Sequence, residues 1–266
     1  MKRFRSILIS IYLSFLLFGN HQLTIAQNQK QKNVGILIFD GVQIIDFSGP
    51  YEVFGQAGYN VFTVAEKTEP VLTHMSLDVI PKYNFTNHPR VDILVVPGGG
   101  VPHSLSKDNP TIQWISQTNQ TTEFTLSVCN GAFLLASAGL LINKEATTYA
   151  PMINHIEMFS PNTIPFYDKR FVQSDKIITA GGLSAGIDAS LYLVSLDKGP
   201  GAAREVANNM EYNWDPDSRY VRSELADMNL LNVLDFNPPL NNRKVLEYKG
   251  EDTYWISEFE VKREET

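Results

Sequence analysis

The stretch TEFTLSVCNGAFLLASAGLL, residues 122–141, joins a strand-like apolar run to a helical pattern, and the chain's single cysteine, Cys129, stands at the junction. A strand that passes directly into a helix forces a tight turn, whose side chain projects above the sheet edge beside the helix's first N–H groups. Those donors and the helix dipole favour the thiolate, which is the nucleophilic form of cysteine. The stretch therefore predicts an α/β unit with a reactive thiol, although a lone cysteine in a strand is also a common apolar core residue.

Strands and helices alternate on both sides of this stretch. Apolar runs predict strands at 34–39, 60–66, 91–100 and 123–128, and helical patterns predict helices at 50–58, 109–119, 130–141, 151–159, 184–196 and 202–212. The segment 71–85 predicts a strand or hairpin at the sheet's edge, and 171–182 predicts a hairpin. This alternation over residues 33–212 predicts an α/β fold with an open, mostly parallel sheet and helices on both faces. In such sheets reactive groups gather where strands end and helices begin.

Amide groups and glycines surround the predicted position of Cys129. The run VVPGGG at 95–100 ends a neighbouring strand, and its glycine amides could form an oxyanion hole together with the N–H of Asn130. Asn130 also offers its side-chain amide, and Gly131 allows the close backbone approach that such a turn requires. The three glycines are equally compatible with a plain strand-to-loop turn.

Asp46 is the predicted acid partner of the thiol. It lies in a predicted loop after the first strand and before a helix that Pro50 is expected to open, which puts it on the same side of the sheet as Cys129. Asp46 could instead cap that helix, although Ser48 or Gly49 fits the cap position better if Pro50 is the first helical residue. Glu52 is the reserve candidate because it follows within one or two helical turns.

The N-terminus has the pattern of a cleaved signal peptide over residues 1–27. Three basic residues precede an apolar segment at 7–18 that is short for a bilayer span, so export to the periplasm or medium is expected. An uncleaved anchor is the alternative. Cleavage removes three basic and no acidic residues, which changes the formal charge from −7 to −10 (22 − 3 = 19 basic against 29 acidic). Such an acidic chain argues against nucleic acid or an anionic membrane as a partner.

The cysteine and histidine contents limit the cofactor chemistry. A single cysteine cannot form an internal disulfide, so an exported chain must shield it, use it or pair it between chains. The five histidines are scattered, with no cysteine or second histidine at ligand spacing. We therefore expect no structural zinc site.

Four motifs together resemble one known family. They are FDGVQIIDFSGPYEVF at 39–54, DILVVPGGG at 92–100, VCNGAFLLASAGLL at 128–141 and TAGGLSAGIDASLYLV at 179–194. In this order they resemble the ThiJ/PfpI superfamily, with its flavodoxin-like, class I glutamine amidotransferase-like sandwich, and within it the isonitrile hydratase-like branch. The resemblance implies a domain at 33–214 and leaves a C-terminal extension, 215–266, that is expected to pack on it.

The resemblance implies a role for individual residues. Cys129 matches the family's nucleophile at its strand-to-helix elbow, Asp46 the acid that hydrogen-bonds this thiol, and Gly99 and Asn130 the positions whose amides face the reacting atom. Two positions depart from the isonitrile hydratase pattern. Asn130 replaces a typical Thr, and Tyr149 stands where His is common.

The resemblance implies a cofactor-free enzyme that adds water to a small electrophile, converting an isonitrile to an N-substituted formamide. The alternatives are a glyoxalase-type dicarbonyl hydratase and a non-catalytic exported ligand-binding or thiol-sensing protein. A true glutamine amidotransferase is disfavoured because His155 and Glu157 follow the cysteine too closely, and both His155 and Asp188 are expected to be structural. A transcription regulator is disfavoured because no helix-turn-helix pattern follows the domain. Members of this family often pair, so a homodimer is expected.

Overall fold

The computed structural model describes residues 31–100 and 106–215, and its central element is a seven-stranded sheet. The sheet order is β10-β11-β7-β6-β1-β2-β5, and every neighbouring pair is parallel except β10 with β11. The strands are β1 (Asn33–Leu37), β2 (Asn60–Ala65), β5 (Tyr83–Asn84), β6 (Ile93–Val96), β7 (Phe124–Val128), β10 (Phe171–Ser174) and β11 (Ile177–Ala180). This confirms the predicted α/β fold. The signal peptide lies outside the described residues, as does all but the first residue of the extension.

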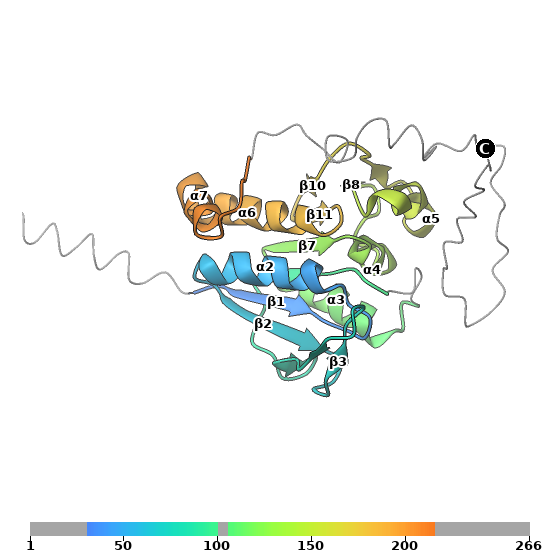
Figure 1. Cartoon of the computed structure of the whole chain (residues 1–266). Helices are drawn as coiled ribbons and strands as arrows, with labels where there is room; N and C mark the ends of the chain where they lie inside the picture. Colours follow the sequence, from blue (N-terminus) through green and yellow to red (C-terminus); the bar gives the residue numbers. More distant parts are fainter. Residues whose placement is uncertain (1–30, 101–105, 216–266) are drawn as a thin grey trace, which may run out of the picture. The chain divides into compact units, whose positions relative to one another are not determined.

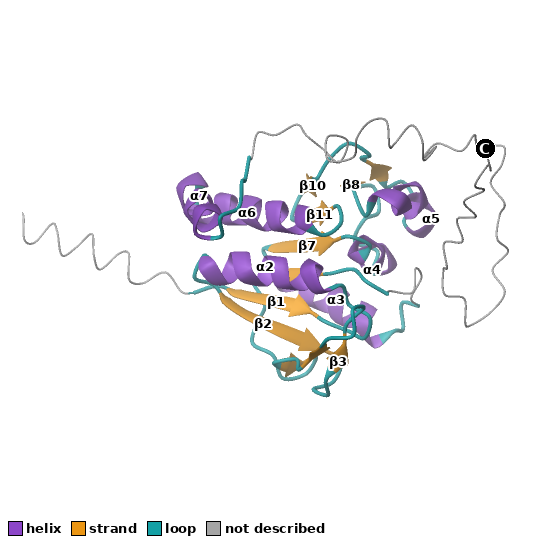
Figure 2. Cartoon of the chain, viewed as in Figure 1, coloured by secondary structure: helices purple, strands orange, loops and turns teal. Residues whose placement is uncertain are grey.

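Helices cover both faces of this sheet (Figures 1 and 2). They are α2 (Ile44–Gln56), α3 (Pro110–Thr121), α4 (Gly131–Ser137), α5 (Ile156–Phe159), α6 (Ser184–Lys198) and α7 (Pro200–Asn209), with a 3₁₀ turn, η1 (Ala150–His155). Helices α2, α6 and α7 share one apolar core with the sheet, and α3 and α4 share the other. No helix among the described residues is both long and apolar enough to span a bilayer.

Alternation along each strand explains the two cores. In β1, Val34 and Ile36 point into the α2, α6 and α7 core, whereas Leu37 points into the α3 and α4 core. Strand β6 divides in the same way, with Val95 and Val96 on opposite faces. Because both faces are covered, these strands are apolar throughout, which is why the sequence shows continuous apolar runs.

Several short elements refine the predicted pattern. The hairpin predicted at 171–182 is β10 and β11, and its antiparallel pairing ends the parallel part of the sheet. The segment 71–85 divides into a separate hairpin, β3 (Val71–Leu72) with β4 (Asp78–Val79), and the edge strand β5. A small sheet of β8 (Glu145–Ala146) and β9 (Ile164–Pro165) was not predicted.

Helix α2 corrects one sequence prediction. It begins at Ile44 rather than at Pro50, so Asp46 lies in its first turn and not in a loop. Pro50 lies inside the helix, where it lacks the N–H that a helix interior normally uses. The packing of this segment compensates. Phe47 and Pro50 are buried, and Gly49 lies so close to Ile187 of α6 that a Cβ there would be 2.9 Å from the isoleucine side chain.

Candidate active site

Cys129 occupies a tight turn between β7 and α4, as predicted. Its φ of 57° lies in the left-handed region, which a residue with a Cβ seldom adopts unless its surroundings hold it there. Its N–H donates to the Gly181 carbonyl at 2.8 Å, and its own carbonyl accepts from the Thr148 hydroxyl at 2.7 Å. Only 9% of the residue is exposed. The backbone is therefore fixed on both sides of a thiol with narrow access.

Gly131 begins α4 in direct contact with the end of β6. A Cβ at this position would lie 2.2 Å from the carbonyl oxygen of Val96 and 2.8 Å from the backbone of Pro97. Real Cβ atoms do not approach backbone so closely. The close approach expected of Gly131 is thus present, and it brings the first turn of α4 against the loop that carries Gly98 and Gly99.

Asp46 is fully buried and lies against Cys129. Its carboxylate accepts hydrogen bonds from the N–H of Gly98 at 3.2 Å and of Leu183 at 3.1 Å, and it also hydrogen-bonds the Cys129 thiol. Burial raises the pKa of this carboxyl from 3.8 to about 6, while the three hydrogen bonds oppose the rise. No side chain caps the start of α2, so the capping alternative for Asp46 is wrong.

Glu52, the reserve candidate, lies elsewhere. It is exposed on α2 and accepts a hydrogen bond from Gln56 at 2.9 Å. Asp46 is on the buried side of the same helix, because the first turn of α2 packs over the carboxyl ends of β1 and β6. Of the two acids, the structure brings only Asp46 to the thiol.

The Asn130 side chain pairs with the backbone of Gly99. This changes the expectation that the Gly99 N–H and the Asn130 side-chain amide both face the reacting atom. The Asn130 Oδ1 accepts from the N–H of Gly99 at 2.7 Å, and its Nδ2 donates to the carbonyl of Gly99 at 2.8 Å. The Gly99 amide, predicted to face the reacting atom, is therefore already engaged, and so is the Asn130 carboxamide. The backbone N–H groups of Asn130 and Gly131 have no acceptor within the described part of the chain, so these two are left for a developing negative charge.

The Asn130 pairing predicts a stability effect. Replacing Asn130 by alanine leaves both polar groups of the Gly99 backbone without their partner, which we expect to cost about 1–3 kcal/mol of unfolding free energy. Urea unfolding followed by circular dichroism measures it. An alanine variant as stable as the wild type would contradict the pairing.

Three residues beside the thiol were not predicted as part of the site. Gly182 lies between the thiol and Tyr149, since a Cβ on it would be 3.6 Å from Cys129 Sγ and 2.9 Å from the tyrosine ring. Leu183, with a φ of 56°, presents its N–H to Asp46. The motif GGLSAGID at 181–188 contains Gly182 and Leu183 and is the signal that marks this segment in the sequence.

His155, Glu157 and Asp188 are the other residues that the sequence singled out. His155 ends η1 and is partly buried, and Glu157 is exposed on α5. Asp188 is buried on α6, where it pairs with Arg170 and accepts from Tyr212 at 3.0 Å. Within residues 31–100 and 106–215, no cluster of three or more histidine, cysteine, aspartate or glutamate side chains could hold a metal ion.

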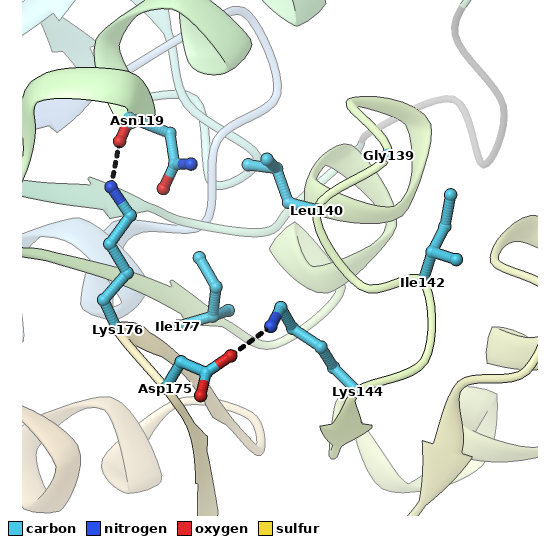
Figure 3. Close-up of a pocket in the computed structure, with 8 residues that line it drawn as sticks. All are labelled: Asn119, Gly139, Leu140, Ile142, Lys144, Asp175, Lys176 and Ile177. Atoms are coloured by element: carbon cyan, nitrogen blue, oxygen red, sulfur yellow. Dashed lines mark hydrogen bonds and ion pairs between the residues drawn. The ribbon is translucent and has the colours of Figure 1, made fainter.

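A cavity of about 370 Å³ lies at the amino end of β11, whereas Cys129 follows the carboxyl end of β7 (Figure 3). It is lined by Asn119, Gly139, Leu140, Ile142, Lys144, Asp175, Lys176 and Ile177. Its two lysines are engaged within the chain: Lys144 pairs with Asp175 at 2.6 Å, and Lys176 donates to the carbonyls of Asn119 and Thr122 at the end of α3. The cavity contains no nucleophile from the cysteine site, so we do not assign the chemistry to it.

Comparison with known proteins shows the family and the fold. The model of the DJ-1/PfpI family matches residues 32–196. An isonitrile hydratase from Pseudomonas putida is 33% identical over 180 residues, 67% of this chain and 78% of the relative. Protein/nucleic acid deglycase 2 from Escherichia coli is 23% identical over 154 residues, 56% of this chain and 88% of the relative. The crystal structure of a ThiJ/PfpI family protein from Pseudomonas syringae superposes with a TM-score of 0.65 at 25% identity, covering 78% of this chain and 88% of the other.

Proposed function

The chain belongs to the DJ-1/PfpI family, and from this membership we propose that Cys129 and Asp46 catalyse the addition of water to an isonitrile, giving an N-substituted formamide. The isonitrile hydratase relative supports an enzyme role at the level of the family. One observation carries the proposal: the only thiol of the chain hydrogen-bonds a buried carboxyl whose pKa is raised to about 6. Such a pair can hold a single proton near neutral pH and move it during a reaction.

The pair accounts for each proton in the reaction. The Cys129 sulfur forms a bond to the terminal carbon of R–N≡C while the proton shared with Asp46 is delivered to that carbon, which yields the thioimidate R–N=CH–S–Cys. Water then adds to this carbon, the carbon–sulfur bond breaks, and the thiol regains its proton as R–NH–CHO leaves. The free N–H groups of Asn130 and Gly131 are suited to the negative charge that develops during water addition. No redox step is involved.

The surroundings of the thiol favour an apolar substituent R. Tyr149 and Leu183, each 41% exposed, are neighbours of Gly182, which lies against the Cys129 sulfur. The Tyr149 hydroxyl has no hydrogen-bond partner within the described residues. The Tyr149 ring beside Gly182 offers an apolar surface near the nucleophile, which suits alkyl or aryl isonitriles, because these carry no charge.

Incubation of the purified protein with cyclohexyl isonitrile tests the proposal. We expect catalytic formation of N-cyclohexylformamide, measured by chromatography, and a mass increase on Cys129 when the reaction is stopped during turnover. Parallel incubations with methylglyoxal and with peroxide separate the other classes of function. Turnover of the dicarbonyl alone, or oxidation of Cys129 with no turnover of any electrophile, would contradict isonitrile hydration.

Two further properties belong to the proposal. We propose that residues 1–27 are removed on export and that the domain pairs as a homodimer, as members of this family often do. The mass of the protein recovered from cells gives the start of the mature chain. Light scattering gives the number of chains in solution, and a monomer at micromolar concentration would exclude the dimer.

A further inference from the structure

A buried ion pair lies next to the segment 181–184, which borders the candidate site. Arg170 precedes β10, and its guanidinium donates to the Asp188 carboxylate on α6. The side chains of Arg170 and Asp188 are only 18% and 12% exposed. Buried charges are costly unless they are paired and hydrogen-bonded, so this pair fixes the position of both groups. The proposed reaction does not use either side chain.

Arg170 also contacts the segment 181–184 at both of its ends. Its carbonyl accepts from the N–H of Gly181 at 2.8 Å, and its Nη2 donates to the Ser184 hydroxyl at 3.1 Å. Ser184 is the first residue of α6. One residue thus holds the segment through its backbone on one side and through its side chain on the other.

The segment 181–184 supports both members of the candidate pair. The Gly181 carbonyl accepts the N–H of Cys129 at 2.8 Å, and the Leu183 N–H donates to Asp46 at 3.1 Å. Leu183 reaches Asp46 only in a conformation with a φ of 56°, which an L-residue holds only when its neighbours are fixed. Residues that hold Leu183 in this conformation therefore also maintain its hydrogen bond to the Asp46 carboxylate.

We propose that Arg170 is a positioning residue, which fixes the segment 181–184 so that the Leu183 N–H is held against Asp46 and the Gly181 carbonyl against Cys129. This inference rests on the proposed reactivity of Cys129 and not on the identity of the substrate. The Leu183 hydrogen bond lowers the pKa of Asp46, against the burial that raises it. Loosening the segment removes a lowering contribution, so the pKa of Asp46 must rise.

The groups that face Asp46 determine what a change in its pKa reports. Its polar neighbours are the N–H groups of Gly98 and Leu183 and the thiol of Cys129, and the thiol is the titratable group among them. Arg170 and Asp188 form a neutral pair that acts on Asp46 through the backbone of Leu183. A shift in the titration of Asp46 therefore reports the position of the Leu183 N–H.

Alkylation of Cys129 by iodoacetamide between pH 4.5 and 9 tests the proposal without any isonitrile. The rate reports one sulfur, because the chain has one cysteine. Alkylation needs the thiolate, and ionised Asp46 can take up the proton of the thiol that it contacts, so the wild-type rate should rise with pH through an inflection where Asp46 ionises, near 6. In Arg170→Lys and Ser184→Ala we expect this inflection to move upward by about half a pH unit or more.

Matched variants separate positioning from general destabilisation. Tyr212→Phe removes the hydrogen bonds of Tyr212 to Asp188 and to Arg170 but leaves the contacts of Arg170 with Ser184 and Gly181 in place, so its inflection should stay at the wild-type pH. Ser184→Ala keeps the Arg170 and Asp188 pair, so its alkylation profile can still be measured if Arg170→Lys does not fold. Inflections at the wild-type pH in both Arg170→Lys and Ser184→Ala would overturn the proposal. The proposed isonitrile hydration can fail independently, because its failure changes turnover and leaves this alkylation profile readable.

Discussion

Replacing Cys129 by serine is expected to reduce kcat/KM for cyclohexyl isonitrile by at least about a thousandfold, because the variant loses the atom that forms the bond to the substrate. A serine hydroxyl is not ionised near neutral pH, and neither Asp46 nor the start of α4 can make it a nucleophile comparable to a thiolate. The measurement is formamide production at saturating and limiting isonitrile, together with the mass of the protein stopped during turnover. We expect neither product nor adduct.

The structure predicts that this variant folds. Serine is close to cysteine in size, and its hydroxyl can donate to the Asp46 carboxylate that the thiol now contacts. Thermal unfolding should therefore differ little from the wild type. Cys129→Ala is the complementary control, because it leaves no group that can form a covalent intermediate. Turnover retained in the alanine variant would disprove the proposed mechanism.

The parts of the fold that follow local patterns could be predicted from the sequence. The strand-to-helix turn at Cys129 was located correctly because the apolar run ends where the helical pattern begins, and Gly131 marks the close approach. The parallel sheet was predictable because strands covered on both faces are apolar throughout. Asp46 was expected on the correct side of the sheet because it follows the end of the first strand.

Features that depend on contacts between distant segments could not be predicted. Helix α2 begins before Pro50 because burial of Phe47 against the sheet and of Gly49 against α6 outweighs the missing N–H of the proline. The pairing of Asn130 with Gly99 joins two turns that are distant in the sequence, and no local pattern indicates which of their amides remain free. The contribution of Leu183 is a backbone N–H, which every residue type except proline would carry.

The ionisation of Asp46 should control the pH dependence of the reaction. Burial raises the pKa of this carboxyl from 3.8 to about 6. Below that pH the Cys129 and Asp46 pair holds two protons and lacks a thiolate, and above it the pair holds the single proton that the reaction moves. We therefore expect kcat/KM to rise with pH through an inflection near 6, measured at constant ionic strength with an uncharged isonitrile.

Asp46→Asn should remove this inflection and lower kcat/KM by about a hundredfold or more, because the asparagine can neither share the proton with Cys129 nor deliver it to the substrate carbon. Stability gives a second readout with a definite sign. Because its pKa is raised, ionised Asp46 costs the folded wild type up to about 3 kcal/mol, a cost absent below pH 3.8 and complete above about 6. Between pH 4 and 8 the free energy of unfolding of the variant, relative to that of the wild type, should therefore increase with pH. A variant that keeps the inflection near pH 6 would show that another group controls it, and would remove Asp46 from the proposed mechanism.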